Sequence, residues 1–187
     1  MADESGPLLS HAADREPTPW KNGLGSATEV ASSPAGAGVD DFDWRVSIAT
    51  ISADSAFSSY EGVDRHIMPL SATGLVLDEN GKRRELAQFE VLGFAGETPV
   101  EAIEVGVETT DLNLMVRRGI RSGSLEKRAV TGSAVLTTDE DTELVIVVLE
   151  GELSLPDAMV TGDALVVGPD DFLMLAGTAT IAVATIG

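Results

Sequence analysis

DLNLMVRR, residues 111–118, alternates side chains with the two-residue period of a β-strand. Three of the four residues on one face are polar, and that face carries Asp111, Asn113, Met115 and Arg117. The other face is apolar and carries Leu112, Leu114 and Val116. Because a buried charge without a partner costs several kcal/mol, on the order of 3–5, the polar face needs partners or a ligand. We therefore expect this strand to line a polar pocket.

Short strands of this kind recur along the chain. Residues 43–51 alternate in the same way, which places Arg45 and Ser47 on one face. Asn80-Gly81 is typical of a tight hairpin turn, since both residues tolerate positive φ. Long amphipathic helical patterns are hard to find, and 19 glycines and 8 prolines punctuate the chain. The pattern predicts an all-β sandwich or barrel.

The second half of the chain resembles a faint copy of the first. Gly74 and Gly96 each follow or precede an alternating run, and Gly151 and Gly177 stand in matching runs later in the chain. The similar separation of the matching glycines in the two halves favours duplication of one β unit. We predict a flexible leader over residues 1–17, a pocket-bearing barrel over 18–118 and a degenerate barrel over 119–187.

Composition limits the classes of function. The chain has 31 acidic and 12 basic residues, a net charge of −19, which disfavours binding to nucleic acid or anionic membranes. It has no cysteine, which excludes disulfides, thiol nucleophiles and thiolate metal sites. No apolar run approaches the ~18 residues of a spanning helix, and the N-terminus lacks a signal-peptide pattern. We expect a cytoplasmic protein.

Two sets of residues suit an anionic ligand. Trp20-Lys21-Asn22-Gly23 offers an ammonium, an amide and backbone N–H groups in a small space. The alternative is a turn anchored by a buried Trp20 with Lys21 exposed. Arg45, with Arg65 as a second candidate, could bind a carboxylate, or Arg45 could form a structural salt bridge with Asp111 or Asp43.

Metal and nucleophilic chemistry find little support. Residues 161–172 resemble a late stretch of cupins, but the chain has only His11 and His66, too few for the three-histidine cupin metal site. A carboxylate site for magnesium or calcium stays open. No Ser-His-Asp constellation can be assembled. His66 fits either a sheet end or acid/base catalysis.

Five ordered blocks resemble the HutD/Ves family of bacterial proteins. They are PWKNG (19–23), FDWRVSIA (42–49), FSSYEGVDR (57–65), FAG (94–96) and DLNLMVRR (111–118). The resemblance implies cupin-like (RmlC-like jelly roll) antiparallel β-barrels in a bicupin arrangement. It also implies an association with histidine utilisation through binding of a formylated or formimino-glutamate-like anion, with no established catalysis. Leu24 departs from the three successive glycines common in the family.

We accordingly predict a metal-independent protein that binds a small anionic metabolite, needs no cofactor, binds neither nucleic acid nor membrane and can form a homodimer. The predicted ligand-binding residues are Trp20, Lys21, Asn22, Gly23, Arg45, Ser47, Arg65, Asp111, Asn113 and Arg117. In this assignment Lys21 and Arg45 meet a carboxylate, the two asparagines bond an amide or formyl group, and Asp111 orients Arg45 or receives an imino N–H. Two rival functions stay open. One is a cupin-type enzyme using His66, Asp111 or Glu61, and the other is a non-catalytic partner-binding module.

Overall fold

The computed structural model describes residues 7–20, 23–155 and 157–187. The chain divides into two compact units, Glu16–Ser122 and Gly123–Gly187, the latter joined by the segment up to Arg15. We call them the 16–122 unit and the 123–187 unit. The only helix in the described ranges is the short 3-10 turn η1 (Ala12–Asp14), and no described helix is long and apolar enough to cross a membrane. The all-β prediction is confirmed.

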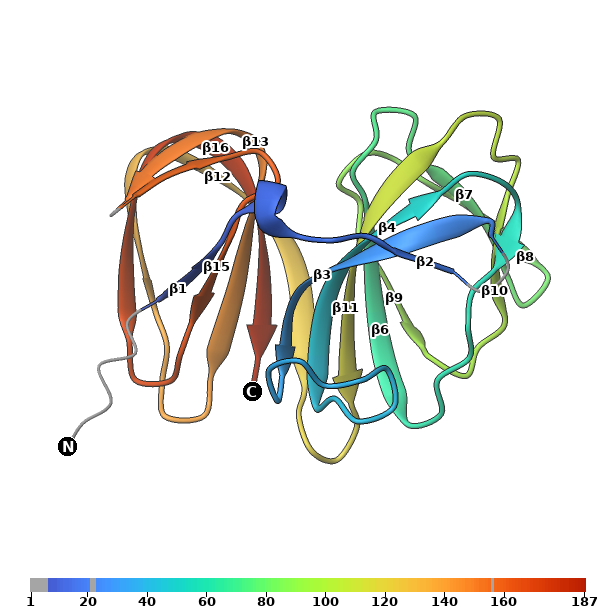
Figure 1. The fold of residues 1–187 in the computed structure, drawn as a ribbon, viewed down its shortest axis with the longest axis horizontal. Helices are drawn as coiled ribbons and strands as arrows, with labels where there is room; N and C mark the ends of the chain where they lie inside the picture. Colours follow the sequence, from blue (N-terminus) through green and yellow to red (C-terminus); the bar gives the residue numbers. More distant parts are fainter. Residues whose placement is uncertain (1–6, 21–22, 156) are drawn as a thin grey trace. The chain divides into compact units, whose positions relative to one another are not determined.

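The 16–122 unit consists of two antiparallel sheets (Figure 1). The six-stranded sheet has the order β2 (Thr18–Pro19), β3 (Gly25–Ser33), β4 (Trp44–Ile51), β11 (Thr109–Arg117), β6 (Val63–Pro69), β9 (Leu92–Ala95). The four-stranded sheet has the order β5 (Ser55–Ala56), β10 (Val100–Ile103), β7 (Leu75–Glu79), β8 (Lys82–Leu86). Asn80 and Gly81 join β7 to β8 with φ values of 50° and 82°, which confirms the predicted turn.

The inner face of the large sheet changes character along its strands. Ile51 on β4 and Ile67 on β6 are fully buried and pack in one cluster with Leu77 and Ala102 of the smaller sheet. From Ile51 along β4 the same face carries Ala49, Ser47 and Arg45, because alternate residues share a face. Ile67 lies level with Asn113 of β11, so apolar and polar side chains lie side by side on this face.

The 123–187 unit is built on one six-stranded antiparallel sheet. Its order is β1 (Leu8–Ser10), β15 (Ala164–Val167), β13 (Glu143–Leu155), β16 (Phe172–Ile186), β12 (Gly123–Thr137), and β14 (Asp157–Val160) pairs with β13. Figure 1 shows the three long strands of this sheet curving strongly. The side chains they enclose form an aliphatic core that includes Ile146, Val148, Leu175 and Ile181.

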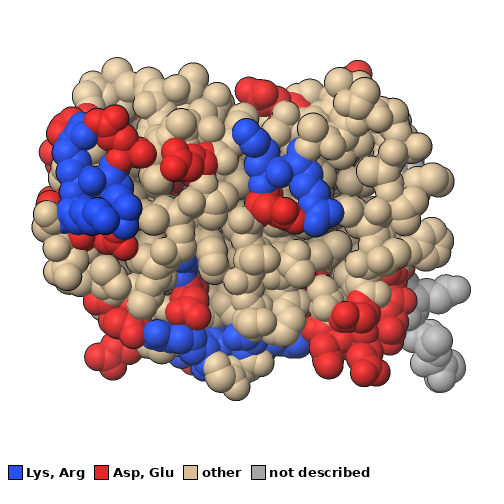
Figure 2. Space-filling model, turned by 180° about the vertical axis from the view of Figure 1, so that it is seen from behind, with Lys and Arg blue, Asp and Glu red and all other residues tan. Residues whose placement is uncertain are grey.

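Charged side chains on the surface gather in groups of both signs. Figure 2 shows lysine and arginine side chains in a few clusters, each next to acidic side chains. Arg83 on β8 illustrates the pattern, since its Nη2 lies 2.9 Å from Glu104 Oε2 and it also pairs with Glu85. The basic groups on the face in view therefore form no continuous basic surface.

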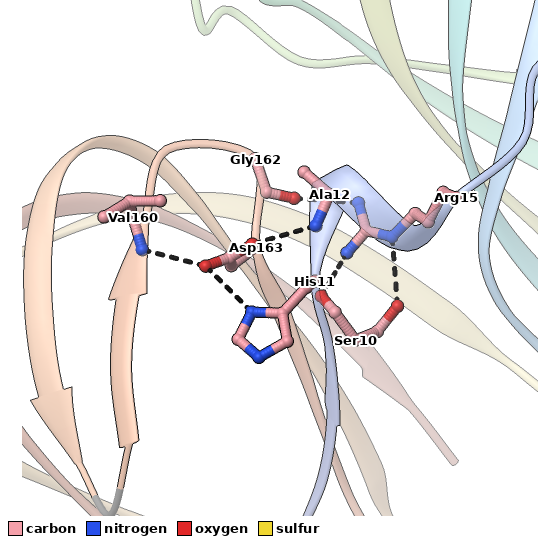
Figure 3. Close-up of polar contacts among 7 residues, drawn as sticks. All are labelled: Ser10, His11, Ala12, Arg15, Val160, Gly162 and Asp163. Carbon is pink, nitrogen blue, oxygen red and sulfur yellow. Dashed lines mark hydrogen bonds and ion pairs between the residues drawn. The ribbon is translucent and has the colours of Figure 1, made fainter.

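The segment before residue 16 differs from the predicted flexible leader wherever it is described. Leu8–Ser10 form strand β1, which pairs with β15. Asp163 holds the following turn: it accepts hydrogen bonds from the Ala12 N–H at 2.8 Å and the Val160 N–H at 3.0 Å, and its Oδ2 lies 3.4 Å from His11 Nδ1 (Figure 3). Burial acts to raise the pKa of Asp163, but the hydrogen bonds outweigh it and the pKa is lowered.

Arg15 closes this arrangement from the other side. Its Nη1 donates to the Gly162 carbonyl at 2.8 Å, and its Nη2 and Nε donate to the Ser10 carbonyl and hydroxyl at 2.6 and 3.0 Å (Figure 3). The segment is thus fixed by partners about 150 residues away in sequence. Composition alone carries no sign of such partners.

Candidate functional site: a buried polar cavity in the 16–122 unit

The inner polar face of the large sheet lines a cavity of about 620 Å³. Strand β4 contributes Arg45, Ser47 and Ala49, and β11 contributes Asp111, Asn113 and Met115. Cross-strand register places Asp111 opposite Ala49, Asn113 opposite Ser47 and Met115 opposite Arg45. The remaining wall is formed by Thr18, Pro19, Trp20, Ala27, Ala37, Gly38, Val39, Ala56, Phe57, Ser58, Tyr60 and Arg65. The predicted strand face at Asp111, Asn113 and Met115 thus lines a pocket.

Arg65, Asn113 and Asp111 form a hydrogen-bonded chain along this wall. Arg65 donates from Nη2 and Nε to Asn113 Oδ1 at 3.0 and 3.4 Å. Asn113 Nδ2 in turn donates to Asp111 Oδ2 at 3.0 Å. All three side chains are buried. Because the asparagine both accepts and donates, it connects the cation to the carboxylate without direct ion pairing.

The guanidinium of Arg65 lies among aromatic rings. Its Cζ is 5.2 Å from the ring centroid of Phe94, 5.3 Å from Phe57 and 5.7 Å from Tyr60. Its Nη1 also donates to the Ser58 carbonyl at 3.2 Å. Burial lowers the pKa of Arg65, while Asp111 and Tyr60 act in the opposite direction. The ring faces stabilise the buried cation and fix its position.

Asp111 is the least satisfied group in the cavity wall. Its side chain is fully buried, and among the described residues Oδ1 has no hydrogen-bond partner. Burial raises the pKa of Asp111 to about 7, although Arg65 and the bond from Asn113 favour the charged form. Such an unpaired acceptor costs about 1–3 kcal/mol unless something donates to it. Because Asp111 lines the cavity, a donor that reached Oδ1 from the cavity would remove this cost.

Arg45 is held by Glu29 of strand β3. Arg45 Nε donates to Glu29 Oε2 at 2.9 Å, and Ser32 Oγ donates to Glu29 Oε1 at 3.0 Å. The register of β3 against β4 shifts between Glu29 and Ala31, so Glu29 pairs with Ser47 and Ser32 pairs with Arg45. Without this bulge, residues three apart would face opposite sides of the sheet. The alternative considered for Arg45, an ion pair with Asp111 or Asp43, is not found; its partner is Glu29, which no sequence pattern indicated.

The Trp20 segment contributes one wall of the cavity. Lys21 and Asn22, two of the predicted ligand-binding residues, lie outside the described residues. Gly23, a third predicted residue, does not line the cavity. It has a φ of 71°, and its N–H donates to the Trp20 carbonyl at 3.0 Å. Gly25 is required by close approach, because a Cβ there would lie 2.3 Å from the Thr50 carbonyl oxygen and 2.8 Å from the Trp20 ring. This contact fixes the indole against the sheet.

Arg117, also predicted as a ligand-binding residue, does not line the cavity. Its Nε and Nη2 donate to the carbonyls of Phe42 and Asp40 at 3.0 and 2.8 Å, and its guanidinium lies over the Phe42 ring. It therefore holds the loop before β4, whose Ala37, Gly38 and Val39 line the cavity. Arg117 shapes the site through this loop and has no direct place in the wall.

Only one of the three residues considered for acid/base catalysis lines the cavity. Asp111 lines the cavity, but His66 and Glu61 do not. His66 points to the opposite face of β6 from Arg65, and burial lowers its pKa against the effect of Asp64. Trp44 is buried on the opposite face of β4 from Arg45, because neighbouring residues of a strand face opposite sides. Phe57 and Tyr60 line the cavity and were not predicted individually, although they belong to the FSSYEGVDR block.

Metal-binding geometry is lacking in the part of the chain that the structure describes. In these described residues there is no group of three or more histidine, aspartate or glutamate side chains that could hold a metal ion. His11 lies beside Asp163 in the 123–187 unit, and His66 belongs to the 16–122 unit. The chemistry visible in the cavity is that of hydrogen bonding and charge.

Known proteins of similar sequence are bacterial. Protein Ves of Citrobacter koseri is 31% identical over 146 residues, which are 77% of this chain and 73% of Ves. An uncharacterized 21.2 kDa protein in the hutC 3′ region of Pseudomonas putida is 38% identical over 108 residues, which are 57% of this chain and 56% of that protein. The chain thus spans a little over half the length of the second relative.

The fold has a close counterpart among solved structures. One is the structure of HutD from Pseudomonas fluorescens SBW25, described with the words "Formate condition". Its TM-score is 0.81 and its sequence identity is 28%, and the alignment covers 97% of this chain and 98% of that chain. The predicted fold class, all-β and cupin-like, is confirmed. The family model described as HutD matches residues 12–186, nearly the whole sequence. The chain belongs to the HutD family.

Proposed function

We propose that this protein binds a small anionic metabolite in the cavity of the 16–122 unit, without a metal. The observation that carries the proposal is that Oδ1 of the fully buried Asp111 has no hydrogen-bond partner among residues 7–20, 23–155 and 157–187. A fold whose only task was stability would replace such a group by an apolar residue, because buried charges rarely stabilise. Its retention beside a cavity of about 620 Å³, within the usual range of ~300–1,000 Å³ for ligand sites, supports a binding role.

The polar groups of the wall specify the chemistry of the ligand. Arg45 bonds Glu29 through Nε, and among the described residues its two Nη groups have no hydrogen-bond partner. They can donate to a carboxylate. Asp111 Oδ1 accepts an N–H when ionised, or donates a proton when neutral, and Ser47 lines the cavity as a further hydroxyl. The ligand should thus carry a carboxylate and, at its other end, a nitrogen or carbonyl group.

Formimino-glutamate and formyl-glutamate both have this combination. We infer that one of them is the ligand and that its binding modulates histidine utilisation by limiting flux. The names of two relatives support this choice, since one is HutD and the other is encoded in the hutC 3′ region. The formate condition described for HutD from Pseudomonas fluorescens is also compatible with a site for small carboxylates.

The pH dependence of affinity separates two modes of binding at Asp111. The pKa of Asp111 is raised to about 7 by burial. A ligand that donates an N–H, such as a formimino group, needs ionised Asp111 and should bind more tightly as pH rises through 7. A ligand whose formyl oxygen accepts from the neutral carboxyl should bind more tightly below 7. Titrations at pH 6 and pH 8 would distinguish them.

A thermal-shift screen tests the proposal. The panel is histidine, urocanate, formimino-glutamate, formyl-glutamate, formate and divalent metals. A ligand at about 100 times its dissociation constant stabilises the native state by ~2.7 kcal/mol, which is readily seen. We expect stabilisation by a formimino or formyl acid, lost in Asp111→Asn and Arg45→Ala and kept in the exposed control Glu101→Gln. Stabilisation by none of them, or equal stabilisation of Asp111→Asn, would refute the proposal. Product formation during incubation would favour an enzyme.

A further inference from the structure

The outer face of one end of the 123–187 sheet is unusually apolar. Four of the largest exposed apolar side chains of the protein lie there: Phe172 (68% exposed), Val135 (62%), Val160 (55%) and Met174 (52%). Val135 and Met174 are direct cross-strand partners, and Phe172 is two residues from Met174 on the same face. A cluster of this kind on a surface marks an interaction site more often than a solvated one.

The positions around these four side chains are also uncharged. The face comprises twelve outward positions, four each on β12 and β16 and two each on β13 and β14, across the rungs from Thr178 to Phe172. Glu152 is the one charged residue among them, and the others besides the four apolar side chains are alanine, serine or threonine. In the whole chain 43 of 187 residues are charged, a much larger share than on this face. We call these twelve positions the β12–β16 face.

The edge of this face is equally unprotected. Strand β12 is the last strand of the sheet in the described structure and pairs only with β16. Exposed edges normally carry lysine, proline or inward charge to prevent association. From Thr131 to Thr137 the strand has neither charge nor proline. Nothing in this stretch opposes contact with another chain.

We propose that the β12–β16 face is the contact surface of a homodimer, in which a second copy of the chain packs the same face against it. The choice of a second copy rests on charge. Two chains of net charge −19 repel each other wherever their acidic surfaces meet. The β12–β16 face, with one charge in twelve positions, lets them approach with little repulsion. A strongly basic partner would instead be drawn to the acidic surface.

The size of the face predicts a reversible dimer. With strands ~4.8 Å apart and residues ~3.3 Å apart, seven residues on each of β12 and β16 and three on each of β13 and β14 cover about 320 Å² per copy. Two copies then bury roughly 640 Å² in flat projection, below the range of about 1,000–1,200 Å² for a stable specific interface, so the dimer should be weak. The association should therefore depend on concentration. Salt should strengthen it by screening the like charges of the two copies.

Sedimentation equilibrium of the full chain tests this, over concentrations from about 1 to about 300 µM. We expect a monomer–dimer equilibrium for the wild type, with association at least about tenfold weaker in Val135→Glu. Val107→Glu is the matched control, because Val107 lies in the 16–122 unit and is also 62% exposed. It should associate like the wild type. Unchanged thermal unfolding of both variants would show that each is folded.

A charge-pair experiment tests whether the face meets itself. In an isologous contact, residues near the twofold axis approach their own copies. Val135→Glu and Val135→Lys should each dimerise poorly alone, and an equimolar mixture should recover the association. A wild type that stays monomeric throughout, or a Val135→Glu variant that dimerises as strongly as the wild type, would overturn the proposal. Failure of the mixture to recover would exclude face-to-face packing.

Discussion

The two units of this protein fill their interiors in different ways. The 123–187 unit encloses an aliphatic core, represented by Ile146 and Ile181. The 16–122 unit has an apolar core and, beside it, a cavity walled by Arg65, Asn113 and Asp111. Both units are antiparallel β structures, so the strand architecture alone does not account for the polar cavity. The difference supports the proposal that the polar cavity binds a ligand, because an apolar filling would raise stability.

The aromatic residues follow the same division. Of the chain's eight aromatic residues (2 Trp, 1 Tyr and 5 Phe), seven lie between residues 16 and 122, and Phe172 is the exception. Three of the seven surround the Arg65 guanidinium. Large rigid rings frame a space and hold a cation in place. Branched aliphatic side chains make up most of the core of the other unit.

The largest expected effect is a pH-dependent stability due to Asp111. Burial raises its pKa in the folded state to about 7, above the ordinary value of 3.8. The folded state then binds more protons than the unfolded state between these pH values, so the stabilisation present below pH ~4 is lost as pH rises to ~7. Relative to Asp111→Asn, the unfolding free energy of the wild type should fall by at most ~4 kcal/mol between pH 4 and 8.

Denaturant unfolding of both proteins at several pH values would measure this difference, since other carboxyl groups titrate equally in each. Glu101→Gln, an exposed change on β10, should stay within ~0.5 kcal/mol of the wild type throughout. A constant difference between wild type and Asp111→Asn would mean that the cavity wall is solvated and that the contrast between the two interiors is overstated.

Arg65→Met should destabilise the 16–122 unit by about 3 kcal/mol. The change removes two hydrogen bonds to Asn113 and one to the Ser58 carbonyl and leaves buried acceptors unpaired. Denaturant unfolding at pH 7 is the measurement. Arg83→Met on the exposed β8 should leave the stability nearly unchanged. Equal small effects of both changes would show that the hydrogen-bonded chain does not hold the cavity.

A matched pair of alanines compares the two interiors directly. Ala49 lines the cavity and is 6% exposed, and Ala179 belongs to the aliphatic core and is 7% exposed. Ala179→Leu should overpack its core at a cost of about 1–3 kcal/mol, whereas Ala49→Leu has room and should cost less than ~1 kcal/mol. Chemical denaturation gives both values. Larger destabilisation by Ala49→Leu would mean that the cavity is not open space.

The smallest effect concerns the loop over the cavity. Arg117→Ala removes the hydrogen bonds to the carbonyls of Phe42 and Asp40, which should lower stability by about 1–2 kcal/mol and loosen residues 34–41. Limited proteolysis should then cut the chain faster within that range. Arg84→Ala, which removes an ion pair with Glu79 on the other sheet, should leave the cleavage rate unchanged. If Arg117→Ala and the wild type were cleaved at the same rate, Arg117 would not hold this loop.

The alternation of residues 111–116 was sufficient to predict the cavity face of β11, because strand period depends on local sequence alone. Glu29 could not be found this way. It meets Arg45 only because a bulge in β3 shifts the register, and a bulge has no reliable signature in a single sequence. By alternation Arg117 belongs to the cavity face of β11. It is the last residue of the strand, however, and its side chain donates to a loop carbonyl, that of Phe42.

The same limit explains the N-terminal segment. Its composition resembles that of a leader, yet Asp163 and Gly162 hold it by hydrogen bonds that span about 150 residues of sequence. Long-range partners of this kind are invisible to local patterns. The HutD resemblance, in contrast, depends on several ordered blocks together, and the family match confirmed it.

The central claim, that the unfilled cavity of the 16–122 unit is the ligand site, is tested most directly by calorimetric titration of formimino-glutamate into the wild type and Ala49→Leu. Leucine at this position occupies the cavity without removing any polar group. We predict one ligand bound per wild-type chain, and affinity reduced at least about 100-fold, or ~2.7 kcal/mol, in a folded Ala49→Leu. Equal binding by the two proteins would contradict the claim, because the ligand would then bind outside the cavity.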